Sequence, residues 1–237
     1  MRRDHHSWHS PRLDRSMDLL EFGDRGRPLL AFPTSSGRFF DYENFGMVNA
    51  LRHKLEQGEV HLFCVDSVDA ESFYAKHKHP ADRIGRHLEY ESYIIEEVMP
   101  LIRSHNSTPY LAITGNSFGG YHAMNFGLRH PDIVDQAISL GGAFDMRDFF
   151  DGYYDDNVYY NSPLDFVPGL QDSWFIHQYN HHCRLVLSTG EWDVCRGSNE
   201  QLGGLLSGKG IRHDLHVHQG MGHDWHYWFD MINRYVP

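Results

Sequence analysis

The sequence has few cysteines and no long apolar run. Only three cysteines occur, Cys64, Cys183 and Cys195, and their spacing matches no zinc motif. An odd number of cysteines suits a reducing compartment, so we expect a cytoplasmic protein without a disulfide framework. No apolar stretch approaches the roughly 18 residues of a transmembrane helix, and the start, Met1–Trp8, lacks the apolar centre of a signal peptide. We therefore expect no membrane association.

Basic residues are also scarce. The 21 lysines and arginines are outnumbered by 32 aspartates and glutamates, which gives a formal net charge of −11. This excess argues against nucleic acids or anionic membranes as partners, because both repel a negative surface. Hydrophobic residues make up 41% of the chain, enough for a packed core. With no repeats or linkers, we expect a single domain over residues 1–237.

The most informative segment surrounds Ser117. An apolar, β-branched run leads into Gly115-Asn116-Ser117-Phe118-Gly119, and a helix-like stretch follows at Tyr121–Arg129. A serine at the apex of a sharp strand-to-helix turn adopts a strained backbone, and a Cβ at either flanking glycine would collide across the turn. The helix also directs its positive N-terminal end at the site. This pattern predicts that Ser117 is a nucleophile.

An acid and a histidine follow in the chain order that an α/β-hydrolase requires. Asp193 comes just after a buried strand at Cys183–Gly190, and His223 lies in a glycine-rich loop after a short strand at Asp214–His218. The carboxyl ends of strands in an open α/β sheet build the active site. We therefore predict a triad in which His223 is the base and Asp193 orients it.

Two other carboxylates compete with Asp193. Glu191 is nearer the strand and serves if the turn is tighter than assumed, whereas Asp172 precedes a predicted helix at Ser173–Asn180 and suits its N-cap. Among 19 histidines, His216 and His218 share one strand face, but no third metal ligand is convincingly placed. We expect no metal and no cofactor.

Backbone amides are the predicted oxyanion donors. One belongs to Phe118, the residue after the nucleophile. The other lies in the loop after a strand at residues 28–33, with Ser35 preferred over Thr34 and Ser36. In an acyl transfer these donors stabilise the negative oxygen of the tetrahedral intermediate.

A segment rich in aromatic and acidic residues, Phe149–Tyr160, follows one of the strands at the same edge. Tyrosines beside acids can bind a ring or a sugar, so we expect a lid or a substrate wall; the alternative is an insert that only packs its rings. The predicted substrate-binding residues are Tyr153, Tyr154, Trp192, Trp225 and Tyr74.

Helix and strand patterns alternate along the chain. Such alternation predicts an α/β fold of the α/β-hydrolase type, with a mainly parallel central sheet, helices on both faces and the short aromatic insert near the site. The expected elements are an edge strand at Arg12–Phe22, a helix at Asn44–Gln57, a strand at Val60–Val65, a long helix at Asp82–Ser104 and a strand at Gln136–Gly141.

The chain resembles the esterase D group of α/β-hydrolases, which includes S-formylglutathione hydrolase, enterochelin esterase, feruloyl esterases and mycolyltransferases. The resemblance covers residues 27–236. It is carried by Gly115–Gly120, by Gly222-His223-Asp224-Trp225, by the helix Tyr90–Ile102 and by Asn161-Ser162-Pro163. Pro33-Thr34 stands where the group usually has His-Gly. The glycine- and cysteine-bearing signature of S-formylglutathione hydrolase is missing from that loop, which argues against that activity.

These features lead to a functional expectation. We expect a serine esterase that hydrolyses a small-molecule carboxylic ester through an acyl-enzyme. An acyltransferase with the same triad is the nearest alternative, and a non-catalytic binding protein on the same fold is another. The sequence leaves a homo-oligomer open.

Overall fold

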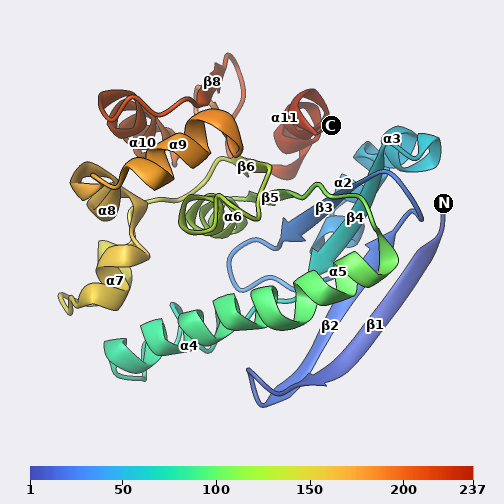
Figure 1. The fold of residues 1–237 in the computed structure, drawn as a ribbon, viewed down its shortest axis with the longest axis horizontal. Helices are drawn as coiled ribbons and strands as arrows, with labels where there is room; N and C mark the ends of the chain where they lie inside the picture. Colours follow the sequence, from blue (N-terminus) through green and yellow to red (C-terminus); the bar gives the residue numbers. More distant parts are fainter. Residues whose placement is uncertain (237) are drawn as a thin grey trace.

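The computed structural model describes residues 1–236 around one eight-stranded sheet (Figure 1). The strand order is β1-β2-β4-β3-β5-β6-β7-β8. The two pairings of β2 are antiparallel and all others are parallel, so the sheet is mainly parallel, as predicted. The strands are β1 Arg3–Ser10, β2 Arg15–Phe22, β3 Arg27–Phe32, β4 Val60–Val65, β5 Ala112–Asn116, β6 Gln136–Leu140, β7 Arg184–Gly190 and β8 Asp214–His218.

Helices cover both faces of the sheet. One apolar cluster joins one face to α2, α3 and α11, and a second joins the other face to α4, α5, α6, α9 and α10. The helical elements are α1 Asp41–Asn44, α2 Met47–Ala50, α3 Arg52–Gln57, α4 Pro80–Tyr93, η1 Ile94–Val98, α5 Met99–His105, α6 Phe118–Arg129, η2 Arg147–Phe149, α7 Asp156–Tyr160, α8 Pro163–Gly169, α9 Ser173–His181, α10 Arg196–Gly208 and α11 Trp225–Tyr235.

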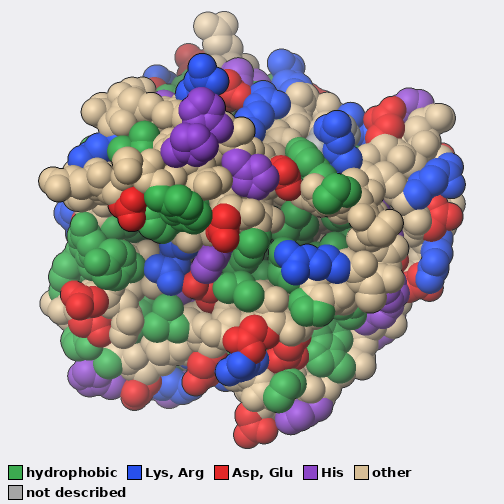
Figure 2. All heavy atoms as spheres, viewed as in Figure 1, with side chains coloured by type: hydrophobic (Ala, Val, Ile, Leu, Met, Phe, Trp, Pro, Cys, Tyr) green, Lys and Arg blue, Asp and Glu red, His purple; other side chains and the backbone are tan. Residues whose placement is uncertain are grey.

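Two properties of the described chain bear on its surroundings. No helix within residues 1–236 combines the length and the apolar character needed to cross a bilayer. On the face shown in Figure 2, acidic and basic side chains are interspersed rather than separated into large patches of one sign.

The predicted edge strand was misplaced. Arg12–Phe22 corresponds to β2, which begins at Arg15 and is the second strand; the edge is β1, Arg3–Ser10. Apart from Trp8, the sequence of β1 is polar on both faces, so it lacks the apolar alternation that predicts a strand. It forms because all eight of its residues pair with β2.

Two predicted helices are interrupted. The helix expected at 44–57 is split into short pieces, and Gly46 lies between two of them with a left-handed φ of 93°. The helix expected at 82–104 begins at Pro80, and its middle, Ile94–Val98, is a π-turn. Pro100 follows this turn and has no N–H to donate into a regular helix, which gives a reason for the wider turn.

Candidate active site

Ser117 lies at the sharp turn between β5 and α6. Its backbone has φ 55° and ψ −120°, a left-handed conformation that strains any residue with a side chain. A Cβ on Gly115 would lie 2.1 Å from the carbonyl oxygen of Gly119, and one on Gly119 would lie 2.4 Å from that of Pro33. The predicted need for glycine on both sides of the serine is therefore confirmed.

Ser117, His223 and Asp193 form one hydrogen-bonded chain. The Ser117 hydroxyl lies 2.9 Å from His223 Nε2, and His223 Nδ1 lies 2.8 Å from Asp193 Oδ1. A carboxylate only accepts, so Nδ1 carries the proton and Nε2 is free to accept from the serine. Asp193 is buried, whereas His223 is partly exposed. The arrangement can remove a proton from Ser117 without any side-chain movement.

Further contacts hold the Asp193 carboxylate in place. Its Oδ1 also accepts a hydrogen bond from the backbone N–H of Cys195 at 2.7 Å. Gly141, at a φ of 59°, leaves room for Oδ2, because a Cβ there would lie 2.5 Å from it. The Trp228 ring meets the His223 ring edge to face at 4.9 Å. Asp193 and His223 are thus fixed by a residue just after β6, by the residue just before α10 and by a residue of α11.

The competing carboxylates lie elsewhere. Glu191 accepts from the backbone N–H of Gly220 at 3.0 Å, and the side chain is exposed. Asp172 accepts from Trp174 N at 2.8 Å and caps α9, as predicted. His218 contacts Ser188 at 2.9 Å, away from this hydrogen-bonded chain. Of the candidate acids, only Asp193 reaches His223 among the described residues.

The loop after β3 packs directly against the elbow. Ser35 Oγ accepts a hydrogen bond from the Tyr74 hydroxyl at 2.9 Å, and the Tyr74 ring packs on Phe118 at 5.4 Å. Burial raises the pKa of Tyr74, so this hydroxyl stays protonated and keeps donating. The Ser36 N–H is directed instead at Asp69, 3.3 Å away. The Ser36 amide is therefore already engaged, which leaves the amides of Ser35 and Thr34 as the other predicted oxyanion donors of this loop.

A buried hydrogen bond between a histidine and an aspartate supports this loop from behind. Asp69 accepts from His122 Nε2 at 2.8 Å, and both side chains are at most 3% exposed. His122 belongs to α6, the helix that begins at the elbow, and the other oxygen of Asp69 holds the Ser36 amide. The pair therefore fixes the loop after β3 relative to α6.

The aromatic insert meets the elbow through Phe149. Its ring lies 5.3 Å from both Phe118 and Tyr74. Tyr153 packs on His79 instead and donates to Asp155, while Tyr154 is 54% exposed. The structure thus brings Tyr74 beside the elbow, but the insert residue that reaches it is Phe149 and not either predicted tyrosine.

The two predicted tryptophans differ in their surroundings. Trp192 is 68% exposed beside Asp193, and its backbone N–H donates to Met221 O at 2.9 Å, which joins the loop that carries Asp193 to the loop that carries His223. Trp225 stacks on Phe45 at 4.9 Å and meets Trp228 at 5.5 Å. Trp225 therefore contacts Trp228, the residue that packs on His223, whereas Trp192 is exposed to solvent.

Cys195 adds a potential metal ligand to this group. Ligand atoms of Asp193, Cys195 and His223 lie within 4.8 Å of one another. Burial and the charge of Asp193 raise the pKa of the Cys195 thiol to about 11, so the thiol is protonated at neutral pH and is a poor ligand. Asp193 Oδ1 is already engaged by two donors. These contacts favour a hydrogen-bonded role for the group over a metal site.

Sequence reasoning missed three residues that shape the site. Gly141 follows β6 and Trp228 lies four positions after Asp224 in α11, and neither carries a motif of its own. Phe149 was within the predicted insert but was not singled out. A signal was available for Gly141, because it lies at the carboxyl end of a strand, where the other site residues also emerge.

Comparisons with known proteins identify the family and the fold. A family model described as "Putative esterase" matches residues 37–236. The chain belongs to this esterase family. The expectation of an ester-hydrolysing enzyme and the resemblance to this group are therefore confirmed. No curated protein matches the sequence.

Solved structures of esterases share the fold. A ferulic acid esterase superposes with a TM-score of 0.79 at 16% identity, covering 100% of this chain and 96% of that one. S-formylglutathione hydrolase from Staphylococcus aureus gives 0.75 at 18% identity, with coverages of 99% and 95%. The enzyme of that name from Agrobacterium tumefaciens gives 0.75 at 16% identity, with coverages of 97% and 91%. The predicted α/β-hydrolase fold is confirmed.

Proposed function

We propose that this esterase is a serine carboxylic ester hydrolase that works through a Ser117–His223–Asp193 triad and an acyl-enzyme. The observation that carries the proposal is the unbroken chain of hydrogen bonds from Ser117 Oγ through His223 to Asp193, at 2.9 and 2.8 Å. A serine held in strained backbone at the first turn of a helix supports the same role.

The chemistry begins with attack of Ser117 Oγ on the acyl carbon of a small-molecule ester. His223 Nε2 accepts the hydroxyl proton while Asp193 keeps Nδ1 protonated and stabilises the imidazolium. The backbone N–H groups of Phe118 and Ser35 donate to the negative oxygen of the tetrahedral intermediate. When that intermediate collapses, the C–O bond to the alcohol breaks and His223 returns the proton to the leaving oxygen.

The second half repeats these steps with water. Water donates a proton to His223 Nε2 as it attacks the acyl carbon, and Ser117 Oγ recovers that proton when the acid leaves. The aromatic side chains of Tyr74 and Phe149 beside the elbow support an ester with a ring near its acyl carbon. The solved relative described as a ferulic acid esterase makes methyl ferulate a suitable probe.

Active-site labelling tests the proposal. A fluorophosphonate should label the protein once, and peptide mapping should place the label on Ser117. Ser117→Ala should abolish labelling and lower kcat/KM for p-nitrophenyl acetate by about a thousandfold to a millionfold. Ser207→Ala, at an exposed serine of α10, is the matched control and should behave as the wild type.

Three outcomes would count against this assignment. Near-wild-type turnover in Ser117→Ala rules out this nucleophile, provided that the variant's melting temperature shows it folded. Labelling at another serine moves the site. A product ester formed in preference to the free acid when an alcohol is added would indicate acyl transfer in place of hydrolysis.

A further inference from the structure

A buried glutamate on the first hairpin is surrounded by three histidines. Glu21 of β2 is 1% exposed. Its Oε2 lies 2.7 Å from His6 Nε2 and 2.8 Å from His105 Nδ1, and its Oε1 lies 2.8 Å from His61 Nε2. We propose that His6, Glu21 and His105 form a binding site for a divalent transition-metal ion of the Zn²⁺ type, separate from the ester-hydrolysing site.

Strand register brings these side chains to one face of the sheet. β1 and β2 pair His6 with Leu19, and β2 and β4 pair Glu21 with Phe63. Side chains two positions apart on a strand share a face, so His6, Glu21 and His61 all point to the same side. That side is covered by α5, which ends at His105. The cluster therefore follows from sheet geometry and one helix terminus.

His61 orients the glutamate and does not present a lone pair to an ion. Asn106 Oδ1 accepts from Thr108 N at 2.9 Å, and its Nδ2 donates to Gly26 O at 2.9 Å and to His61 Nδ1 at 3.1 Å. Since Nδ1 accepts, Nε2 carries the ring proton and donates to Glu21 Oε1. His61 is thus the kind of outer partner that fixes a ligating carboxylate, and Oε2 is left for the ion.

The other two histidines are free to change tautomer. Within residues 1–236, no hydrogen bond involves His6 Nδ1 or His105 Nε2, so each ring can carry its proton there. The lone pairs of His6 Nε2 and His105 Nδ1 then face Glu21 Oε2. The two rings also meet edge to face at 5.0 Å, which keeps their nitrogen atoms close together.

Donor type and spacing fit a zinc-like ion. The three ligand atoms lie within 4.8 Å of one another, and donors around tetrahedral zinc are about 3.3 Å apart. Loading requires small outward movements of His6 and His105, whose side chains are 22% and 30% exposed. Two imidazoles and one carboxylate suit borderline ions, and the exposed side leaves room for water as a further ligand.

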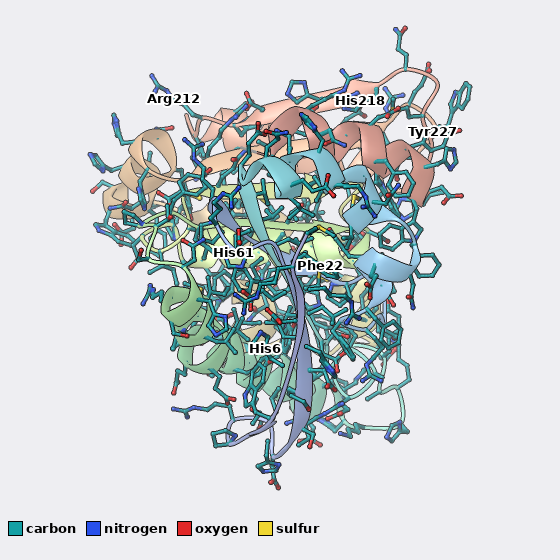
Figure 3. All side chains as sticks on the ribbon, turned by 90° about the vertical axis from the view of Figure 1, so that its right-hand side faces the viewer. His6, Phe22, His61, Arg212, His218 and Tyr227 are labelled. Atoms are coloured by element: carbon teal, nitrogen blue, oxygen red, sulfur yellow. The ribbon has the colours of Figure 1, made fainter. Side chains whose placement is uncertain are left out.

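The site lies away from the elbow. Glu21 and His61 are near the beginning of β4, whereas Ser117 follows the end of β5, and these two strands run parallel on either side of β3. Figure 3 shows His6 and His61 on the part of the molecule that carries the first hairpin. His218 and Tyr227 lie near the top of the same view. A bound ion would link β1 and β2 to α5 through its ligands and would not contact the triad.

Other histidines make controls necessary. Figure 2 shows several histidines near the top of the view, in the region where Figure 1 places α9. His177 and His181 of α9 are four residues apart with ring centroids 4.5 Å apart, a spacing that can also bind zinc. His5 is a second control, because it lies on β1 but bonds to Asp18 on the opposite face of the sheet.

The test is a calorimetric titration of the chelator-stripped, full-length protein with Zn²⁺, together with its melting temperature with and without Zn²⁺. The wild type should bind Zn²⁺ and melt at a higher temperature when loaded. His6→Ala and His105→Ala should each weaken the tightest binding event by at least about tenfold and remove the rise in melting temperature. His5→Ala, His181→Ala and His223→Ala should keep both effects.

Because His105 is partly exposed, its variant should fold even if a Glu21→Gln variant does not. Unchanged Zn²⁺ affinity in both His6→Ala and His105→Ala would overturn the proposal, as would loss of binding in His181→Ala or His223→Ala alone. A wild type that binds no Zn²⁺ would also overturn it. None of these readouts uses ester turnover, so the result is independent of the proposed triad.

Discussion

The backbone of Ser117 is held at a φ of 55°, a conformation that costs a non-glycine residue about 1–3 kcal/mol. The surrounding structure enforces it, since Gly115 and Gly119 allow a chain approach that no larger residue permits. This constraint could be predicted from the sequence, because glycine spacing records it directly. The position of Asp193 could be predicted only as a loop at a strand end, which left Glu191 as a rival.

The two carboxylates should differ sharply in their effect on turnover. Asp193→Asn should lower kcat by about ten-thousandfold, because an amide no longer holds the His223 tautomer that accepts the serine proton. Glu191→Gln removes only an exposed bond to Gly220 and should leave kcat near the wild-type value. Steady-state kinetics with p-nitrophenyl acetate measures both, and the reverse ranking would transfer the role to Glu191.

Gly141 should prove essential although it has no side chain. In Gly141→Ala the new Cβ would lie 2.5 Å from Asp193 Oδ2 and 3.2 Å from His223 Nδ1. Displacing these groups should lower kcat by about a hundredfold. Gly210→Ala is the matched control, because its φ of 67° imposes a similar backbone strain while no described heavy atom lies within 4 Å of the Cβ. Equal turnover in the two variants would exclude a contact with the acid as the cause.

At the scale of elements, the insert after β6 was recognised by composition but its contacts were not predictable. Phe150 is buried and Phe149 packs against the elbow, whereas Tyr154 is exposed. Aromatic content does not show which ring turns inward. That orientation depends on hydrogen bonds to the backbone. Lys76 donates to the carbonyl oxygens of Asp148 and Phe149 at 3.0 Å, which holds this part of the insert beside Tyr74.

Phe149 should influence large substrates more than small ones. Phe149→Ala removes a ring that lies 5.3 Å from Tyr74 and should raise KM for methyl ferulate by about three- to tenfold. KM for p-nitrophenyl acetate should change much less, because its short acyl group does not reach the ring. Tyr154→Ala, at an exposed position, serves as the control. A parallel change for both esters would instead indicate that Phe149 only supports the fold.

Polar edge strands and helix irregularities escaped the sequence analysis for a common reason. The contact that joins β1 to the π-turn at Ile94–Val98 is made by residues 87 and 89 positions apart in the sequence. Trp8 and Ser10 of β1 both donate to Glu97 at 2.7 Å, so the strand and the irregular helix stabilise each other. Neither element has a local pattern that would reveal this contact, and the His6–Glu21–His105 cluster was missed for the same reason.

At the scale of the whole molecule, the fold and the site converge on α6. This helix begins at the elbow and ends at Arg129, which donates to Glu91 of α4 from two nitrogens at 2.9 Å each. His130, just after α6, lies 2.9 Å from the same carboxylate. The helix α6 is thus fixed by sheet contacts at the end that carries Ser117 and by an ion-pair cluster at the other end.

This cluster should make the free energy of unfolding depend on pH in the acidic range. Burial opposes ionisation of Glu91, but hydrogen bonds from His130 and Arg129 outweigh it and lower its pKa from 4.5 to about 2. A carboxyl whose pKa is lower in the folded state stabilises the fold fully above about pH 5 and loses that contribution as the pH falls toward 2. Its loss between pH 7 and pH 3 should be about 2 kcal/mol.

Urea unfolding of the wild type and of Glu91→Gln at pH 7 and pH 3 measures this contribution. The variant should be less stable at pH 7, but its free energy of unfolding should fall by about 2 kcal/mol less than that of the wild type on going to pH 3. Glu89→Gln is the control: Glu89 belongs to the same helix, but its side chain is 53% exposed, so its ion pair with Arg86 should matter little. If the free energy of unfolding falls equally in Glu91→Gln and the wild type, acid sensitivity arises elsewhere. The contact between α4 and α6 then does not depend on the charge of Glu91.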